Sequence, residues 1–338
     1  MNSGRLVRIY LLLLVFITTL GGLLFWGIYH QTLNTIVSEL KLESNILINQ
    51  LSKQISLAFI EIHSDLLYII EQQEIRDLNP ENTTQIKLDH IQESWKSLVL
   101  QRKRYDQIRF LDHTGQERIR VNYNNGNPIV IEDEYLQSKK HRYYFTESIN
   151  TPPGTIYSTQ LDLNIENQQI ELPLKPTIRF ASPVYDNNSE TIGVVILNYL
   201  ADIILNEFRR ISAGFAGNAI LLNWQGYTLL SPESAQDWGF MFPDSPQTGI
   251  NVQHATVWRT IQQLNRGQEI NQQGLYTFDA INPSGNKLDS YCASCLRVLL
   301  QIPKELIDAK SKTTRRAGGM MKAPGGGYVR VQPISSAP

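Results

Sequence analysis

Three arginines occupy positions where a buried strand would ordinarily carry an apolar residue. Arg109 lies in the stretch QIRFLD, Arg120 in ERIRVN and Arg179 in TIRFAS. An arginine side chain stays protonated and presents five donors in a planar fork, so it suits the bidentate capture of a carboxylate or a phosphate. Gathered on one surface, these side chains would recognise a small anion.

Strand alternation predicts that the three arginines share a face. Successive side chains of a strand point to opposite sides, so Tyr105 and Arg109 are expected on the face opposite Phe110. The same alternation sets Arg120 and Arg179 opposite their own apolar neighbours. One face of the predicted sheet would therefore pack on a helix, and the other would be polar and positively charged.

We expect loops between the strands, including TPPGTIYSTQLDLNIENQQ, to fold over the polar face and form a lidded pocket. Arginines would clamp the anionic group of a ligand, tyrosines would form aromatic walls, and an aspartate and an asparagine would receive an amine or hydroxyl. The candidate ligand-binding residues are Tyr105, Arg109, Arg120, Tyr157, Asp162, Asn164 and Arg179. A structural alternative stays open, in which the arginines face solvent or form a salt-bridge network with residues such as Asp112 and Glu171.

Patterns for other chemistry are missing from the sequence. The six histidines show no metal-binding spacing, and there is no G-x-S-x-G and no glycine-rich phosphate loop. The stretch DLNIEN resembles part of a calcium loop, but it lacks the glycine and the terminal glutamate of such a loop. We therefore expect no catalytic residue, no metal and no cofactor, with calcium as a weak alternative.

Cys292 and Cys295 are the only cysteines. Outside the cytoplasm this C-x-x-C pair could form a small-loop disulfide, and otherwise the two are expected to be buried thiols. A redox-active pair would need a thioredoxin-like helix start, and two ligands are too few for structural zinc.

The segment 9–29 carries no charged residue and is long enough to cross a bilayer once as a helix. Arg5 and Arg8 precede it, so the N-terminus is expected in the cytoplasm and the bulk of the chain in the periplasm or outside the cell. A cleaved signal peptide is the alternative, but FWGIYHQ offers no small-x-small cleavage site. The net charge of -1 argues against a nucleic-acid partner.

Hydrophobic periodicity divides the rest of the chain. A spacing near 3.6 predicts one long amphipathic helix from the membrane to Leu78, with part of its apolar stripe left for a homodimer. From Tyr105 the period becomes 2, and the stretches YDQIRFLD, QERIRVNY, GTIYSTQ, PTIRFASPVYD and TIGVVILNYL predict one antiparallel sheet. The stretch ADIILNEFRRI then returns to helical spacing.

A second unit repeats this order of elements on a smaller scale. NAILLNWQGYTLLSP predicts a hairpin, TVWRTIQQL a helix, and GLYTFDAINP and CLRVLLQIP two strands. Beyond Arg316 the Gly- and Pro-rich sequence predicts a disordered tail. The predicted fold class is α+β, with a transmembrane helix that continues into a long helix carrying two antiparallel modules.

Several of these stretches, in fixed order, resemble the extracytoplasmic double Cache sensor regions of bacterial membrane histidine kinases and diguanylate cyclases. They include YDQIRFLDHTGQERIRVNY, IGVVILNYL and DWGFMFPD, and the resemblance covers about residues 30–305. It implies two stacked PAS-like modules on a long helix, with a pocket for an amino acid or organic acid usually in the membrane-distal one. The expected boundaries are a cytoplasmic N-terminus at 1–8, a transmembrane helix at 9–29, a stalk helix at 30–79, a distal module at 80–210, a proximal module at 211–303, and a helix remnant with a tail at 304–338.

One feature departs from the pattern that the resemblance implies. Members of the family return to the membrane and place an output domain in the cytoplasm, whereas here ELIDAKSKTTRR leads into the Gly-rich tail. We therefore expect a non-enzymatic sensing region, truncated before its second membrane span. The alternatives are a membrane-anchored scaffold or dimerisation partner and, with less support, a periplasmic hydrolase.

Overall fold

The computed structural model describes residues 3–78, 84–166, 169–233, 235, 237–245, 249–286, 288 and 292–318. The chain forms two compact units, one within residues 1–43, 271–275 and 302–338, and the other within 44–270 and 276–301. The fold is the predicted α+β mixture of long helix and antiparallel sheets. The disordered tail was predicted to begin beyond Arg316, but Ala317 and Gly318 belong to a helix, and the rest of the predicted tail lies outside the described residues.

Helix α1 (Ser3–Ile70) contains both the apolar segment and the amphipathic stretch that the sequence predicted as one helix. Among the described residues, it is the one helix that is long and apolar enough to cross a membrane, with a mean hydropathy of 2.3 in its most apolar window. In the unit that contains its first part, Ile36 and Leu40 are buried, and so is Ile307 of helix α8 (Lys304–Gly318).

The prediction that this helix continues to Leu78 is wrong. Helix α1 ends at Ile70, and Gln72 takes an extended backbone before the short helix α2 (Gln73–Arg76). Ile75 and Leu78 are nevertheless buried in the same core as the end of α1. The apolar spacing therefore persists through the break, which explains why periodicity alone did not reveal it.

The first sheet has seven antiparallel strands, which we call, with their covering helices, the first module. Its main path is β3-β2-β1-β9-β8-β4, and β5 also pairs with β8. The strands are β1 (Tyr105–Asp112), β2 (Glu117–Asn122), β3 (Ile129–Val130), β4 (Tyr157–Ser158), β5 (Asp162–Leu163), β8 (Pro176–Tyr185) and β9 (Thr191–Leu200). A separate hairpin joins β6 (Ile165–Glu166) to β7 (Gln169–Ile170). All five strand predictions for this region are confirmed.

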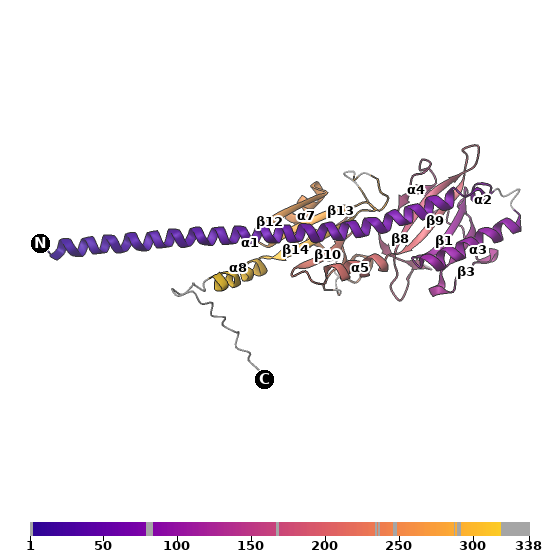
Figure 1. Ribbon diagram of the computed structural model, residues 1–338. Coiled ribbons are helices and arrows are strands. Elements are labelled where there is room, and N and C mark those ends of the chain that lie inside the picture. Colours follow the sequence, from indigo (N-terminus) through magenta and orange to yellow (C-terminus); the bar gives the residue numbers. More distant parts are fainter. Residues whose placement is uncertain are drawn as a thin grey trace, which may run out of the picture. The chain divides into compact units, whose positions relative to one another are not determined.

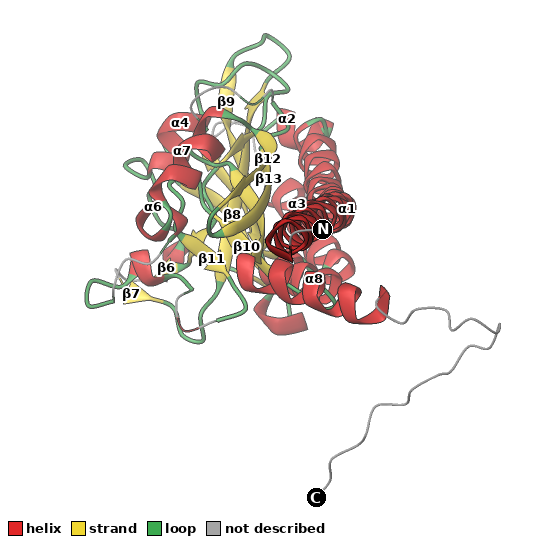
Figure 2. Ribbon diagram, turned by 90° about the vertical axis from the view of Figure 1, so that its left-hand side faces the viewer, coloured by secondary structure: helices red, strands yellow, loops and turns green. Residues whose placement is uncertain are grey.

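Helices cover the two faces of the first sheet differently (Figure 2). The end of α1 and helix α3 (Gln85–Arg102) pack on the apolar face, where the rings of Phe59 and Phe180 lie 5.7 Å apart and Trp95 is fully buried. Helix α4 (Tyr143–Ser148) lies over the other face, where it contacts β8 and β4. The 3-10 turns η1 (Asn124–Gly126) and η2 (Asp133–Tyr135) precede and follow β3 in the chain. Neither α3 nor α4 was predicted.

The second sheet, which defines the second module, has five strands in the order β11-β10-β14-β13-β12. Figure 1 labels β10, β12, β13 and β14 of this sheet. Its strands are β10 (Asn218–Leu222), β11 (Thr228–Leu230), β12 (Arg266–Asn271), β13 (Gly274–Ile281) and β14 (Leu296–Pro303). Helix α5 (Asp202–Ser212) leads from β9 to this sheet, and the helices within the second module are η4 (Gly239–Met241), α6 (Ile250–Gln253) and α7 (Ala255–Gln263). The predicted hairpin, helices and two strands are confirmed, and Cys292 and Cys295 form a disulfide.

Candidate ligand-binding site

The three arginines lie on one face of the first sheet, as strand alternation predicted. Arg109 of β1 pairs directly with Arg120 of β2. Arg179 of β8 is opposite Asn198 of β9, which is in turn opposite Gln107 of β1. Because residues that are directly opposite in neighbouring strands share a face, these side chains form two adjacent cross-strand rows.

The guanidinium groups are withdrawn from solvent. The side chains of Arg109, Arg120 and Arg179 are 5%, 12% and 6% exposed. Tyr144 of α4 covers them, since its hydroxyl is 3.4 Å from Arg109 Nη1 and its ring lies 5.6 Å from the guanidinium carbon of Arg179. The version of the structural alternative in which these arginines face bulk water is therefore wrong.

Two carboxylates lie among these arginines, and we call the three arginines with Glu117 and Asp162 the arginine cluster. Glu117 is fully buried and sits between Arg109, at 3.7 Å, and Arg120, at 3.9 Å. Its Oε2 atom also accepts a hydrogen bond of 3.0 Å from the backbone N–H of Gln137. One carboxylate thus serves two guanidiniums that face each other across the strands, an arrangement of like charges that destabilises a sheet.

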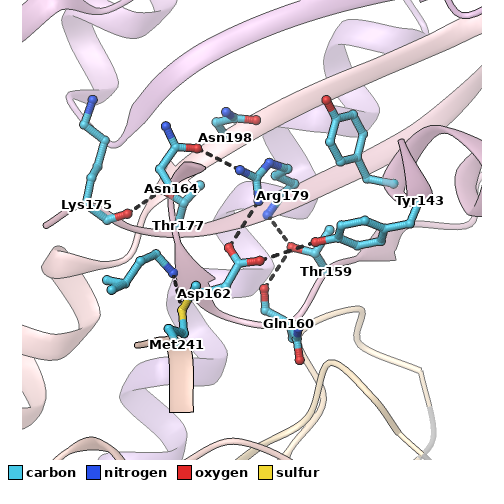
Figure 3. Close-up of polar contacts among 12 residues, drawn as sticks. Tyr143, Thr159, Gln160, Asp162, Asn164, Lys175, Thr177, Arg179, Asn198 and Met241 are labelled. Atoms are coloured by element: carbon cyan, nitrogen blue, oxygen red, sulfur yellow. Dashed lines mark hydrogen bonds and ion pairs between the residues drawn. The ribbon is translucent and has the colours of Figure 1, made fainter. Parts of the chain in front are cut away.

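Arg179 has the more complete set of partners (Figure 3). It donates to Asp162 Oδ1 at 3.2 Å and to Asn164 Oδ1 at 2.8 Å, while the hydroxyl of Tyr143 donates to Asp162 Oδ2 at 3.4 Å. Burial is the largest influence and lowers the pKa of Arg179, but Asp162 together with Tyr143 and Tyr144 outweighs it, and the pKa lies above the ordinary value. Burial raises the pKa of Asp162, although Arg179 acts in the opposite direction. This half of the cluster is a hydrogen-bonded ion pair whose carboxylate bears a cost of burial.

The half around Arg109 is short of negative charge. Burial is the main cause that lowers the pKa of Arg109, and the nearby Arg120 and Arg179 lower it further. The pKa of Lys139 is lowered as well, first by burial and then by the charge of Arg109. Basic groups therefore crowd one another here, which is the electrostatic condition that an added anion would relieve.

Several buried polar atoms of this half also lack a hydrogen-bond partner among the described residues. They are Arg109 Nε, Glu117 Oε1 and Asn198 Oδ1. A buried polar atom without a partner costs about 1–3 kcal/mol, and such atoms in a native protein usually meet a water molecule or a ligand. Arg109 therefore has both a hydrogen-bond donor, Nε, without a partner among the described residues and an excess of positive charge around it.

The prediction for Tyr105 is wrong. A β-bulge between Tyr105 and Gln107 shifts the register of β1 against β9. Tyr105 therefore points to the α1 side of the sheet, where its hydroxyl donates to Asp65 Oδ2 at 2.6 Å and its side chain is fully buried. It takes no part in the arginine cluster.

The segment from Tyr157 to Asn164, part of which was also predicted as a strand in GTIYSTQ, was expected to fold over the polar face, and this expected cover is wrong. It forms the edge strands β4 and β5, which pair with β8, and the cover comes instead from α4. Asp162 and Asn164 reach Arg179 from this edge, while Tyr157 packs beside α4. All three lie on the arginine side of the sheet.

Sequence reasoning missed Glu117 and Tyr144. Simple alternation puts Glu117 on the same side as Ile119, but a second bulge, between Phe110 and Leu111, brings it opposite Leu111 on the arginine face. Tyr144 lies in the short helix α4, which has too few residues to show a period. The aromatic pair in the stretch HRYYF was the one available signal for it.

Two pockets flank the arginine cluster. One of about 380 Å³ is lined by Asp112, Glu117 and Arg118 together with apolar residues such as Leu88. The other, of about 480 Å³, includes Tyr143 and Tyr157 in its lining. Neither lining includes Arg109, Arg120 or Arg179, so the guanidiniums are closed off in this structure. Among the described residues no group of three or more His, Cys, Asp or Glu could hold a metal ion.

The long helix and the two antiparallel sheets form a fold that the chain shares with solved extracellular sensor domains. Residues 56–290 match the model of the family "Bacterial histidine kinase, sensor domain". The chain belongs to this family, which confirms the resemblance to double Cache sensor regions. No curated protein matches the sequence.

Solved structures share this fold at low sequence identity. The extracellular domain of the histidine kinase vpHK1S-Z8 has 17% identity and a TM-score of 0.66, over 87% of this chain and 99% of that chain. A domain of a sensory box/GGDEF family protein from Vibrio parahaemolyticus has 17% identity and a TM-score of 0.65, over 82% and 99%. The sensory domain of the Campylobacter jejuni chemoreceptor Tlp3 has 12% identity and a TM-score of 0.56, over 82% and 98%.

Proposed function

We propose that this chain is the ligand-sensing region of a membrane-anchored receptor of the histidine kinase type. In this proposal the first module binds a small anionic or zwitterionic molecule, of the amino acid or organic acid class, at the arginine cluster. The chain itself carries no catalytic activity and transmits the state of that site toward the membrane.

The observation that carries the proposal is the environment of Arg109. Its buried guanidinium faces Arg120 across the strands, shares one carboxylate with it, and has an Nε atom without a partner among the described residues. A carboxylate ligand would supply the missing acceptor and the missing negative charge together. A purely structural network would be expected to balance its charges internally.

The ligand class is also supported by a structure of the same fold. The sensory domain of the chemoreceptor Tlp3 has been solved with isoleucine and with L-valine bound. Each of these molecules carries a carboxylate and an ammonium group. In our proposal the half around Arg109 receives the carboxylate, and Asp162, at the Arg179 half, receives an ammonium group when the ligand has one.

The proposal includes an inner-membrane location, with residues 9–29 as the single span and the modules outside the cytoplasm. We keep the module boundaries at 80–210 and 211–303. A homodimer is also part of the proposal: Ile46, Leu57 and Tyr68 are exposed apolar residues at intervals of eleven along α1, and this interval is close to three helical turns. They therefore share one face, which a second copy would cover.

The proposal is tested by measuring the heat of binding and the melting temperature with a panel of L-amino acids and dicarboxylic acids. We expect at least one member to bind the wild-type protein and to raise its melting temperature. Arg109→Gln and Arg120→Gln should each weaken that binding by about 30-fold or more, since removing one partner of a buried charge pair costs about 2 kcal/mol or more.

Arg118→Gln is the matched control. Arg118 lies on the same strand as Arg120, but its side chain is 52% exposed and bonds to Asp112 outside the cluster. Glu117→Gln, which removes a carboxylate from the cluster, should lower the melting temperature of the free protein. The rise in melting temperature on ligand binding should be larger in this variant than in the wild type. A panel without any binder, or a ligand bound equally well by folded Arg109→Gln and Arg120→Gln, would count decisively against an anion site here.

A further inference from the structure

A second cleft lies between the two modules and is separate from the arginine cluster. Its volume is about 480 Å³, within the range of about 300–1,000 Å³ that is usual for small-molecule sites. The first module contributes Tyr143, Tyr157 and Gln160, and the second contributes Trp224, Asn286 and Ser294. All of these residues belong to one compact unit of the chain.

The chemistry of this cleft differs from that of the arginine cluster. Among the described residues, the lining includes no Asp, Glu, Lys, Arg or His. Burial raises the pKa of Tyr157 to about 12 and also raises the pKa of Tyr143, so both phenols stay neutral. The hydroxyl of Tyr157 and the amides of Gln160 and Asn286 can both donate and accept hydrogen bonds, whereas the hydroxyl of Tyr143 already donates to Asp162 and can only accept. Such a lining favours an uncharged ligand that is rich in hydrogen-bonding groups.

Three aromatic rings contribute to the walls of the cleft, from Tyr143, Tyr157 and Trp224. Aromatic side chains offer large apolar surfaces with a polar tip. A sugar ring has the matching character, because its C–H faces are apolar and its edges carry hydroxyls. The apolar faces would lie against the rings while the hydroxyls bond to the polar groups.

The turn that carries Trp224 is held in shape before any ligand arrives. Asn223 Oδ1 accepts hydrogen bonds from the backbone N–H groups of Gln225, at 3.0 Å, and Tyr227, at 2.9 Å. Gly226 completes the turn with a φ of +89°, which favours glycine. The backbone of this turn is therefore held by local hydrogen bonds, which limits the backbone ordering that binding would require.

Local bonds also fix the two other loops of the second module. Asn282 Oδ1 accepts from the backbone N–H and the hydroxyl of Ser284, at 3.1 and 2.9 Å, next to Asn286. The disulfide between Cys292 and Cys295 closes the turn that carries Ser294, whose hydroxyl lies 3.1 Å from that of Ser158 in β4. A cleft with preformed walls loses little conformational entropy when it binds a ligand.

We propose that this cleft binds an uncharged saccharide of one or two rings. Because both modules supply its walls, a bound saccharide would favour the arrangement in which the modules hold it, and would thereby influence the same output as the first module. The cleft touches the arginine cluster through Tyr143, whose hydroxyl donates to Asp162, but none of the three arginines lines it, so saccharide binding does not require the proposed anion site.

The test uses the full chain in lipid nanodiscs, since glycoside detergents would compete for the cleft. Saturation-transfer NMR and calorimetry are run with glucose, galactose, maltose and trehalose, and with glucuronate as a charged counterpart. We expect at least one uncharged sugar to bind with a Kd on the order of 1 mM or tighter, and glucuronate to bind at least tenfold more weakly. Trp224→Ala and Asn286→Ala should each weaken the binding at least tenfold, and Trp224→Phe should restore part of it.

Tyr135→Ala is the matched control, because Tyr135 is an exposed aromatic residue, 63% accessible, outside the cleft lining. It should leave sugar binding unchanged. The proposal is overturned when none of the four sugars binds at a sugar concentration about ten times that Kd. It is also overturned when sugar binding is unchanged in both Trp224→Ala and Asn286→Ala. Loss of sugar binding in Arg109→Gln together with its retention in Trp224→Ala would overturn it too, since the sugar would then occupy the arginine cluster.

Discussion

Arginine in the middle of a strand costs stability at Arg109 and Arg120. Arg109 and Arg120 face each other across two strands, and the buried carboxylate of Glu117 lies at 3.7 and 3.9 Å from them, beyond hydrogen-bond distance. Apolar residues of similar volume would usually stabilise such a site more. The cost is understandable when the positive charge serves to capture a ligand, since binding sites often sacrifice stability for function.

His63 supplies a residue-level prediction about pH. Its Nε2 atom lies 2.7 Å from the backbone oxygen of Pro283, and its ring contacts Phe180. Burial lowers the pKa of His63 below its ordinary value of 6.5, although the hydrogen bond to Pro283 acts in the opposite direction. The unfolded chain therefore holds this proton more tightly than the folded chain, and the free energy of unfolding should fall as the pH drops through 6.5 and below.

We expect His63→Gln to remove this part of the pH dependence. Between about pH 7.5 and about pH 5.5 the wild-type protein should lose more stability than the variant, by up to about 1 kcal/mol. Urea unfolding followed by tryptophan fluorescence measures the difference. His113→Gln, at an exposed position on a turn, serves as the control and should behave as the wild type does. If the free energy of unfolding depends on pH equally in the wild type and in His63→Gln, protonation of His63 is not linked to folding.

At the scale of elements, the central strand β9 determines whether the arginine face can form. Gly193 in β9 is opposite Asp112 of β1 and Val184 of β8. A Cβ atom at this position would overlap the backbone oxygen of Leu111 and lie 2.7 Å from two ring carbons of Phe110. The close approach of β1 to β9 therefore requires a residue without a side chain.

We predict that Gly193→Ala lowers the free energy of unfolding by about 1–3 kcal/mol or more, because the added methyl group overpacks the sheet. Gly214→Ala is the matched control, since nothing lies within 4 Å of a Cβ atom built there, and it should stay within about 0.5 kcal/mol of the wild type. Denaturant unfolding of both variants measures the effect. A Gly193→Ala protein as stable as the control would mean that the two strands can separate without loss.

Most strands could be predicted from the sequence because they combine a period of 2 with clear turns, as in PTIRFASPVYD and TIGVVILNYL. The three arginines on one face followed from the same alternation. The features that could not be predicted are the β-bulges and the short helix over the site. Two bulges reverse the expected sides of Tyr105 and Glu117, and a bulge leaves no sign in hydrophobic spacing. The cover of the site was missed because α4 is only six residues long.

Segment β4–β5 connects three parts of the protein. Asp162 and Asn164 bind Arg179, Ser158 contacts Ser294 at 3.1 Å, and the backbone N–H of Leu163 lies 3.2 Å from Met241 Sδ (Figure 3). Ser294 and Met241 belong to the second module. Any shift of this edge on ligand binding would therefore change the contacts with both Ser294 and Met241.

At the scale of the whole molecule, the prediction concerns the side of the membrane on which the modules lie. Protease added to intact spheroplasts should digest them, because Arg5 and Arg8 precede the apolar segment and hold the N-terminus inside. Reversing both charges, as Arg5→Glu with Arg8→Glu, should increase the protected fraction. An antibody against the second module measures the protease-protected fraction in the wild type and in the double variant. Full protection of the wild-type modules would mean that the orientation is the opposite one.

The helix over the guanidiniums also affects how fast the proposed receptor can respond. A solute arriving from the medium meets the outer surface of α4, since Tyr144 lies against Arg109 and Arg179. Association must then wait for α4 to move, and its rate stops rising with concentration once that opening step becomes limiting. Pulses of solute shorter than the opening time would pass unnoticed, so the protein would report sustained supply and ignore brief fluctuations.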